Sequence, residues 1–228
     1  MAIRPIYHSL SHYPYYETIS TEFKYYSGFS VSQKQKSIKS LHTAYTQKFN
    51  ERKIIDISSK STLELGVKLS AFNLMIPAKK HPFSVECAFQ GSKVFENGGP
   101  YMDLIYKNSL EAKKDERLKK SGRLVAFKYF KKEYPLEPKD YFYNWIYINA
   151  LQLNKDLATQ ILEYDSFSDI EFNPQKSFNC QAKAVAIYVG LYKAGIIENA
   201  LKNHKNFLNI VYENSSISYE QVNMFDVK

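Results

Sequence analysis

A glutamate, a glutamine and a lysine lie close together in the stretch VECAFQGSKVFENGGPY, residues 85–101. A helix would place Glu86, Gln90 and Lys93 within one narrow arc of its surface. Glu86 and Lys93 would then be separated by about 10.5 Å along the axis, which suits two groups that converge on one bound molecule better than a direct ion pair. A carboxyl group can transfer protons, and a lysine with a lowered pKa can act as a nucleophile. The same residues are equally ordinary on a solvated helix face, so both interpretations stay open.

Few other residues form a pattern that could do chemistry. His8 and His12 have helical spacing, but Pro14 argues against a helix there, and no cysteine or carboxylate cluster completes a metal site. The two cysteines, Cys87 and Cys180, belong to no paired motif. The sequence has no P-loop, no GxGxxG and no GxSxG pattern. We therefore expect neither a metal nor a cofactor.

Length and composition favour one domain without disulfide bonds. The chain has 228 residues, 44% of them apolar, and no linker rich in Pro, Gly or Ser divides it. Having only two cysteines favours a reducing compartment. The N-terminus lacks an apolar segment of signal-peptide length, and no apolar run approaches the ~18 residues of a membrane span. We expect a soluble, cytoplasmic protein with no membrane partner.

The charge of the chain favours a partner that carries phosphate groups. The formal net charge is +8, and the sequence pI is about 9.2. A mixed run of charges over residues 111–123, EAKKDERLKKSGR, is either a solvated helix face or one flank of a nucleic-acid groove. The 19 tyrosines could stack on bases, although tyrosine more often packs with its hydroxyl in water.

The elements that must position these residues follow from spacing and from proline. Pro5 and Pro14 predict that residues 1–31 are irregular or weakly stranded. The pattern predicts a helix over 33–49 after Ser32, and extended chain over 67–76. Further elements are expected as strands over 53–57 and 123–130, and as helices over 102–122, 138–153, 156–164 and from 181 onward.

The stretch VECAFQGSKVFENGGPY is expected to be a helix that ends at Asn97-Gly98-Gly99-Pro100. Together these elements predict an α+β fold, a mostly helical single domain with a small β-sheet. Residues 1–30 would be a Tyr-rich segment that packs on a domain of residues 31–228.

Two motifs in this order resemble a known superfamily. LSAF, residues 69–72, followed by VECAFQGSKVF, is similar to the paired motifs of the NADAR (YbiA-like) superfamily, in which a Leu-Ser-Asn-Phe-like segment precedes a helix with the same Glu, Gln and Lys spacing. The similarity is closer to the NADAR antitoxins encoded beside DarT-type DNA ADP-ribosyltransferase toxins. The stretches that carry it span roughly residues 28–200: GFSVSQKQKSI, KSTLELGVKLSAFN, AFQGSKVFENGGPY, DERLKKSGRL, FYNWIYINAL and DIEFNPQKSFNCQA.

The resemblance implies an ADP-ribosyl glycohydrolase that removes ADP-ribose from guanine bases of DNA and so reverses a toxin. In this family picture Lys93 attacks C1″ of the ribose and forms an imine, Glu86 is the general acid and base, and Gln90 orients the ribose hydroxyls. The modified guanine would be single-stranded or flipped out. ADP-ribose would be the product, the cognate toxin a possible partner, and no cofactor or metal would be needed.

The resemblance also implies a wider substrate site, in which this chain departs from the family at two places. Cys87 follows the glutamate where many members have His, and DIEFNPQKSFN replaces an Asp-rich loop that contains Trp-Gly. Trp145 could belong to the core or to the pocket, and the Asn97–Gly99 turn is a candidate contact for the pyrophosphate. The residues expected to bind substrate are Ser70, Phe72, Asn73, Gln90, Asn97, Gly98, Gly99, Tyr101, Trp145, Asp169, Glu171, Asn173 and Asn179. Which of Asp169, Glu171 and Asn173 completes the site stays open.

Two other functions remain possible at this point. One is an N-glycosidase of small ribosylated metabolites, as some relatives are in riboflavin metabolism. The other is a non-catalytic antitoxin that binds ADP-ribose or the toxin.

Overall fold

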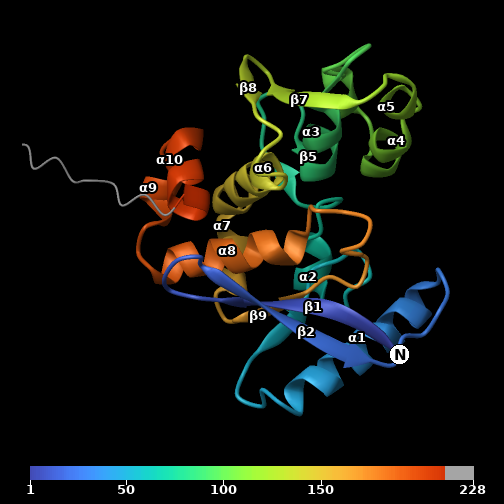
Figure 1. The fold of residues 1–228 in the computed structure, drawn as a ribbon, viewed down its shortest axis with the longest axis vertical. Helices are drawn as coiled ribbons and strands as arrows, with labels where there is room; N and C mark the ends of the chain where they lie inside the picture. The colour runs from blue at the N-terminus through green and yellow to red at the C-terminus, as the bar shows by residue number, and fades with distance from the viewer. Residues whose placement is uncertain (214–228) are drawn as a thin grey trace, which may run out of the picture.

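In the computed structural model, which describes residues 1–213, three small β-sheets lie among ten α-helices (Figure 1). The strands are β1 (Ala2–Ser9), β2 (Tyr16–Phe23), β3 (Ile54–Asp56), β4 (Met75–Ile76), β5 (Phe83–Ser84), β6 (Lys93–Phe95), β7 (Leu124–Tyr129), β8 (Lys132–Tyr134) and β9 (Ser166–Ser168). The helices are α1 (Val31–Thr46), α2 (Glu64–Lys68), α3 (Val85–Gly91), α4 (Ser109–Lys114), α5 (Arg117–Lys120), α6 (Tyr141–Leu153), α7 (Lys155–Ile161), α8 (Gln181–Lys193), α9 (Ile197–Leu201) and α10 (His204–Leu208), with a 3₁₀-helix η1 (Met102–Tyr106) and a π-helix η2 (Asn209–Glu213). The predicted α+β, mostly helical single domain is confirmed, with three small sheets instead of one.

The N-terminal residues form a regular hairpin, so of the two alternatives expected for residues 1–31 the irregular chain is wrong and strands are present. β1 and β2 pair over their whole length, and the sheet continues through β9 to β3 in the order β2-β1-β9-β3. Pro5 lies outside the part of β1 that pairs with β9, where the strand has one neighbour and a proline is tolerated. Pro14 lies in the turn between the strands. The proposed boundary at residue 30 stays a prediction.

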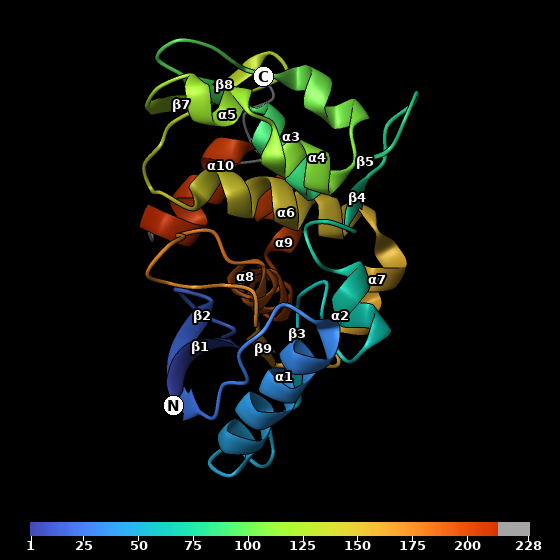
Figure 2. The same ribbon diagram turned by 90° about the vertical axis from the view of Figure 1, so that its right-hand side faces the viewer.

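The hairpin is covered by a helix on each face (Figure 2). Ile6 and Phe23 pack against Leu41 and its neighbours on α1 in a small separate cluster. The next residue of β1, Tyr7, points to the opposite face and belongs to the large core that contains α8. The hairpin is therefore a layer between α1 and α8.

α6 and α8 pass through the middle of the molecule, and the second sheet, β6-β7-β8, lies beyond α6 together with α3, α4 and α5 (Figures 1 and 2). Most residues of α6 and α8 are buried, because the large core surrounds both helices. Within residues 1–213 no helix combines the length and the apolar character that crossing a bilayer requires.

Side-chain hydrogen bonds explain two differences from the predicted elements. The chain over 67–76 is mostly a turn rather than extended, because the Ser70 hydroxyl and the Asn73 amide both donate to the carbonyl of Val67, at 2.8 and 2.9 Å. α1 begins earlier than predicted, because Ser30 rather than Ser32 accepts from the N–H of Gln33.

The contact between the hairpin and α8 depends on a glycine. A Cβ atom at Gly190 would overlap the carbonyl oxygen of Tyr15 and would lie 2.6 Å from that of Leu10. Gly to Ala in a helix ordinarily stabilises a protein by about 1 kcal/mol. We expect Gly190→Ala instead to lower the free energy of unfolding by about 1–3 kcal/mol in urea denaturation, because the hairpin must move.

The control is Gly195→Ala, at a glycine with φ +72° and no atom within 4 Å of a new Cβ. Its cost should come from backbone strain alone, about 1 kcal/mol. A stabilised Gly190→Ala protein would contradict the close contact.

Candidate active site

The motif residues Glu86, Gln90 and Lys93 do not share one helix, so that prediction is wrong. α3 ends at Gly91, and Lys93 is the first residue of strand β6. The chain leaves the helix because the Ser92 hydroxyl donates back to Ala88 O at 2.7 Å, and because β6 then pairs with β7. The Asn97-Gly98-Gly99 segment is accordingly the turn after a strand and not the end of a helix.

Glu86 and Gln90 are buried, which excludes the interpretation of a solvated helix face. Their exposed fractions are 6% and 7%. The Gln90 amide donates a hydrogen bond of 2.9 Å to Glu86 Oε1. A buried carboxyl group needs such partners, because its desolvation is otherwise costly. Gln90 therefore fixes the orientation of the Glu86 carboxyl group.

The amine of Lys93 lies in a largely apolar place. Its Nζ is 4.8 Å from the centre of the Phe89 ring. Burial lowers the pKa of Lys93, the carboxylate of Glu86 acts in the opposite direction, and the nearby Lys113 lowers it again. The net result is a lowered pKa, which increases the share of the neutral amine. A neutral amine beside a carboxyl group is the arrangement that covalent catalysis by lysine requires.

A second lysine reaches the same carboxyl group from α4. Nζ of Lys113 is 4.0 Å from Glu86 Oε1 and 5.1 Å from the centre of the Phe72 ring. A capping box, in which Asn108 and Glu111 each bond the other's backbone, fixes the start of α4.

The LSAF turn, residues 69–72, binds all the helices that surround the site. Its backbone makes four hydrogen bonds to other elements. Leu69 O accepts from the Tyr147 hydroxyl of α6, and Ala71 N donates to Gln181 Oε1 of α8. Ala71 O accepts from Glu86 N of α3, and Phe72 O accepts from the Ser109 hydroxyl of α4. Ser109 also bonds the hydroxyl of Ser84, the N-cap of α3, at 2.7 Å. The turn thus positions Glu86 and the start of α4 together.

Tyr143 forms the α6 side of the site. Its ring meets that of Phe89 edge-on with centroids 5.2 Å apart. Burial raises the pKa of Tyr143 well above its usual range, and the negative charges of Glu86 and Asp169 add to this effect. The hydroxyl is therefore a neutral group that the charges of both carboxyl groups reach.

The loop of residues 169–180 provides the opposite side, and its three candidates differ in position. Asp169 is buried, burial raises the pKa of its carboxyl group well above the usual range, and Oδ1 accepts from Glu171 N. Glu171 instead pairs with Lys34 of α1 at 3.0 Å. Asn173 accepts from Gln175 N within its own turn. Of the three, Asp169 is the one whose charge acts on Tyr143.

The start of this loop is held by Asp56 of β3. Its Oδ2 accepts from the Ser168 hydroxyl at 2.9 Å and from Ile170 N at 3.0 Å. Burial raises the pKa of Asp56 to about 6, although these hydrogen bonds act against the rise. Asp56 thereby fixes the backbone on both sides of Asp169.

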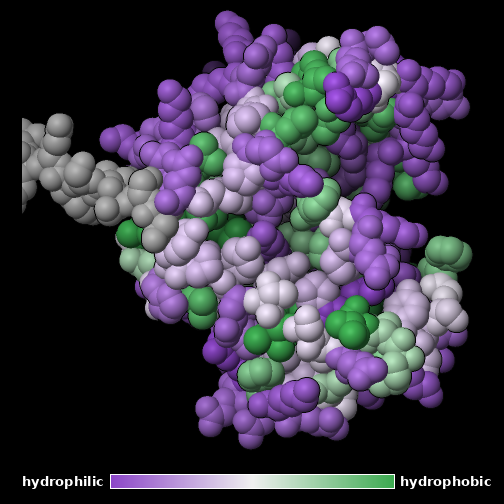
Figure 3. Space-filling model, in the orientation of Figure 1, coloured by the Kyte–Doolittle hydropathy of each residue, from purple (hydrophilic) through white to green (hydrophobic). Residues whose placement is uncertain are grey.

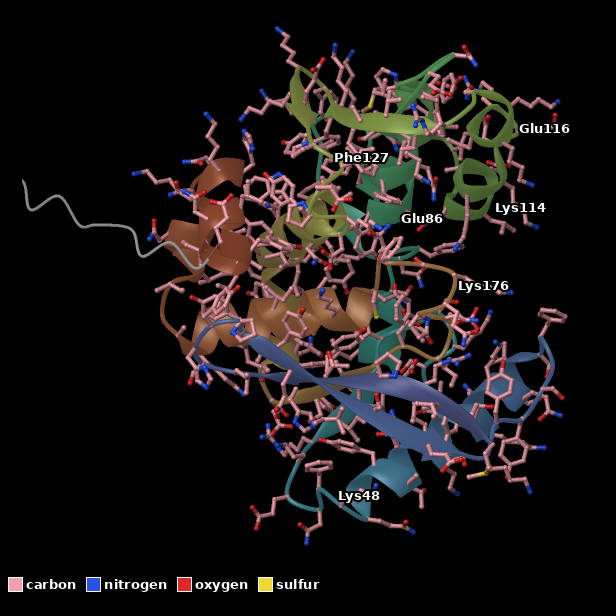
Figure 4. The ribbon with its side chains drawn as sticks, in the orientation of Figure 1. Lys48, Glu86, Lys114, Glu116, Phe127 and Lys176 are labelled. Carbon is pink, nitrogen blue, oxygen red and sulfur yellow. The ribbon has the colours of Figure 1, made fainter. Side chains whose placement is uncertain are left out.

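The site opens on one face of the molecule. Figure 3 shows this face hollowed between the part that carries α3 to α5 and the part that carries the hairpin and the 169–180 loop. Figure 4 shows Glu86 at the end of α3 that faces the loop, with Lys114 projecting from α4 and Lys176 from the loop.

The remaining predicted residues have varied surroundings. Ser70 and Asn73 bond each other inside the LSAF turn. Asn179 precedes α8, and its buried Oδ1 has no hydrogen-bond partner among residues 1–213. A buried acceptor without a partner is unusual in a folded protein.

The Asn97–Gly99 turn is only partly near the site. The backbone N–H of Asn97 donates to the carbonyl oxygen of Ser121, at the end of α5, at 3.0 Å. Gly99 has φ +85°, and a Cβ there would overlap the carbonyl oxygen of Lys93. Gly98 packs against the Tyr101 ring, whose hydroxyl bonds Ser121. Gly99 therefore supports the Lys93 backbone, whereas Asn97 and Tyr101 lie toward α5.

The structure does not bring Trp145 to Glu86. Trp145 follows Tyr143 by two residues, which places it on the other side of α6. There it packs against Phe207 with centroids 5.5 Å apart and lines a separate apolar cavity of about 530 Å³.

Three residues of the site were not in the predicted set. Lys113 belongs to the charge run of residues 111–123, for which a groove flank was one of two interpretations, but nothing in the run singled out Lys113 as facing Glu86. Tyr143 and Gln181 lie in apolar helical segments where the sequence has no signal that separates them from core residues. Within residues 1–213 no three His, Cys, Asp or Glu side chains gather as a metal site would require.

The lowered pKa of Lys93 can be measured by NMR after reductive methylation with ¹³C-formaldehyde. We expect its signal to titrate at lower pH than those of exposed lysines, because burial disfavours the charged form. Glu86→Gln should lower the midpoint of Lys93 further, because the carboxylate favours the charged amine. The signal that is absent from the spectrum of Lys93→Arg is assigned to Lys93, because arginine is not methylated. A Lys93 signal that titrates with the exposed lysines would refute this description of the site.

The chain matches a known protein family. Residues 2–221 match the model of a family described as DarT1-associated NADAR antitoxin. No curated protein matches the chain. The match spans nearly the whole sequence and includes both motifs and the 169–180 loop. The chain therefore belongs to the DarT1-associated NADAR antitoxin family.

Proposed function

We propose that this protein removes ADP-ribose from guanine bases of DNA and thereby acts as the antitoxin of a DNA ADP-ribosyltransferase. The observation that carries the proposal is the pair formed by Lys93, an amine with a lowered pKa, and the buried carboxyl group of Glu86. Family membership supports the antitoxin role.

In the first step the lone pair of the Lys93 amine forms a bond to C1″ of the ribose. The bond from C1″ to the guanine nitrogen breaks, and that nitrogen takes its electron pair and a proton from Glu86. This step needs only one proton on the pair of side chains, because the Lys93 amine has a free lone pair when Glu86 carries that proton. Guanine in the DNA is restored at this point.

In the second step Glu86 removes a proton from the Lys93 nitrogen and delivers it to O4″. The C1″–O4″ bond breaks as the nitrogen lone pair forms a protonated imine. Water then adds to the imine carbon with Glu86 as base, and proton transfers through Glu86 release the Lys93 amine and the aldehyde form of ADP-ribose. The net reaction consumes one water molecule.

The surroundings of the site suit an anionic substrate with sugar hydroxyls. Lys176 borders the hollow (Figure 4), and Nζ of Lys113 lies 4.0 Å from Glu86 Oε1, so phosphate groups of ADP-ribose and DNA would meet positive charge. The buried Oδ1 of Asn179 is an acceptor that a ribose hydroxyl would satisfy. A base inside a duplex could not reach this recess, so we expect a single-stranded or flipped guanine.

The test is turnover of a single-stranded oligonucleotide that carries one ADP-ribosylated guanine. We expect Lys93→Met to abolish release of ADP-ribose, and Glu86→Gln to lower kcat by about 10²–10⁴-fold because the proton carrier is lost. Borohydride added during turnover should reduce the imine and leave ADP-ribose on Lys93, detectable by mass spectrometry.

Lys128→Met is the matched control, since Lys128 lies on the neighbouring strand and pairs with Glu133 at 3.5 Å. It should retain activity. Wild-type turnover in Lys93→Met would exclude the imine route. Cleavage of free ribosylated metabolites but not of modified DNA would favour the small-molecule glycosidase, and binding without turnover would favour the non-catalytic antitoxin.

A further inference from the structure

We propose that Lys113 is a positioning residue of this reaction: its ammonium group holds the Glu86 carboxylate and, by repulsion, favours the neutral, nucleophilic form of the Lys93 amine. The inference rests on the proposed function for its catalytic consequence. Its electrostatic part concerns the free protein and can be tested without turnover.

The backbone of α4 directs Lys113 toward the site. Ser109 and Lys113 are four residues apart and therefore share one face of the helix. Ser109 is anchored on that face by its bonds to Phe72 O and to the Ser84 hydroxyl, both 2.7 Å. The Lys113 side chain consequently extends over the Phe72 ring to Glu86, with Nζ 4.0 Å from Oε1.

Two neighbouring basic residues, Arg117 and Lys107, have carboxylate partners of their own. Arg117 pairs with Asp103 and Asp115 at 2.7 and 2.8 Å, and Lys107 also pairs with Asp115, at 2.9 Å. These pairs lie within η1, α4, α5 and the turns between them. Lys113 differs because its carboxylate partner is the buried Glu86 of another helix.

The charged groups that act on Lys93 come from two elements, Glu86 from α3 and Lys113 from α4. Tyr143 of α6 packs against the same Phe89 ring as Lys93, and the charges of Glu86 and Asp169 reach it. Glu86 favours the charged amine of Lys93, and Tyr143 is neutral because burial raises its pKa well above its usual range. Among the described residues Lys113 is thus the cation that offsets the effect of Glu86 on Lys93.

About half of the Lys113 side chain remains in water: the exposed fraction of its side-chain atoms is 56%, whereas that of the side-chain atoms of Glu86 is 8%. Solvent weakens its interaction with both partners, so the expected effect of its removal is moderate. Its exposure also makes Lys113 replaceable without leaving a cavity, which keeps the test free of large folding effects.

The experiment compares Lys113→Gln, Lys113→Arg and Lys114→Gln. Lys114 is the next residue of α4 and is exposed. Lys114→Gln therefore removes the same charge as Lys113→Gln but no contact to Glu86. We expect Lys113→Gln to move the acidic limb of the kcat/KM pH profile to higher pH and to lower kcat/KM at pH 7 roughly three- to tenfold. Lys113→Arg should restore the profile, and Lys114→Gln should leave it unchanged.

The titration of ¹³C-methylated Lys93 in the free protein gives the second measurement. Lys113→Gln should raise its midpoint, because a repelling charge is removed, and this result holds whether or not the protein cleaves modified DNA. An unchanged midpoint overturns the proposal. So does a higher KM with an unchanged pH profile, which would show that Lys113 only binds phosphate, or an equal effect of Lys114→Gln.

Discussion

The site depends on hydrogen bonds to the backbone of one short turn. Residues 69–72 bind α3, α4, α6 and α8, four helices that are far apart in the sequence. Because backbone groups make these bonds, the turn must keep one conformation, and Ser70 and Asn73 hold it from within. The LSAF motif therefore acts mainly through its backbone, and the Phe72 ring adds a side-chain contact to Lys113.

Burial is what gives the pair of Glu86 and Lys93 its chemistry. Desolvation makes a lysine amine reactive, but it also raises the cost of placing a carboxyl group nearby. Gln90 and Lys113 reduce that cost by bonding or facing Glu86. The nucleophile lies on β6 and the carboxyl group on α3. The carbonyl oxygen of Lys93 lies against Gly99, where any Cβ atom would overlap it, so this position requires glycine.

The sequence was sufficient for the fold class and the family, since motif order and spacing survive without knowledge of contacts. It was insufficient for the end of α3 at Gly91, because β6 forms only when β7, some thirty residues later, pairs with it. The regular β1–β2 hairpin was expected at most as weakly stranded chain, because Pro5 and Pro14 argue locally against a strand and because β9, which extends the sheet, lies far along the chain. Lys113 and Tyr143 join the site through tertiary packing, and no local pattern distinguishes them from a surface lysine or a core tyrosine.

The position of Trp145 has a spectroscopic consequence. It is the sole tryptophan of the chain, and it packs against Phe207 and His204 on the side of α6 that faces away from Glu86. Its fluorescence therefore reports whether α10 is docked on α6. A change in its emission during unfolding therefore reports the separation of α10 from α6. A ligand bound between α3 and the 169–180 loop leaves the surroundings of the indole, and so its emission, unchanged.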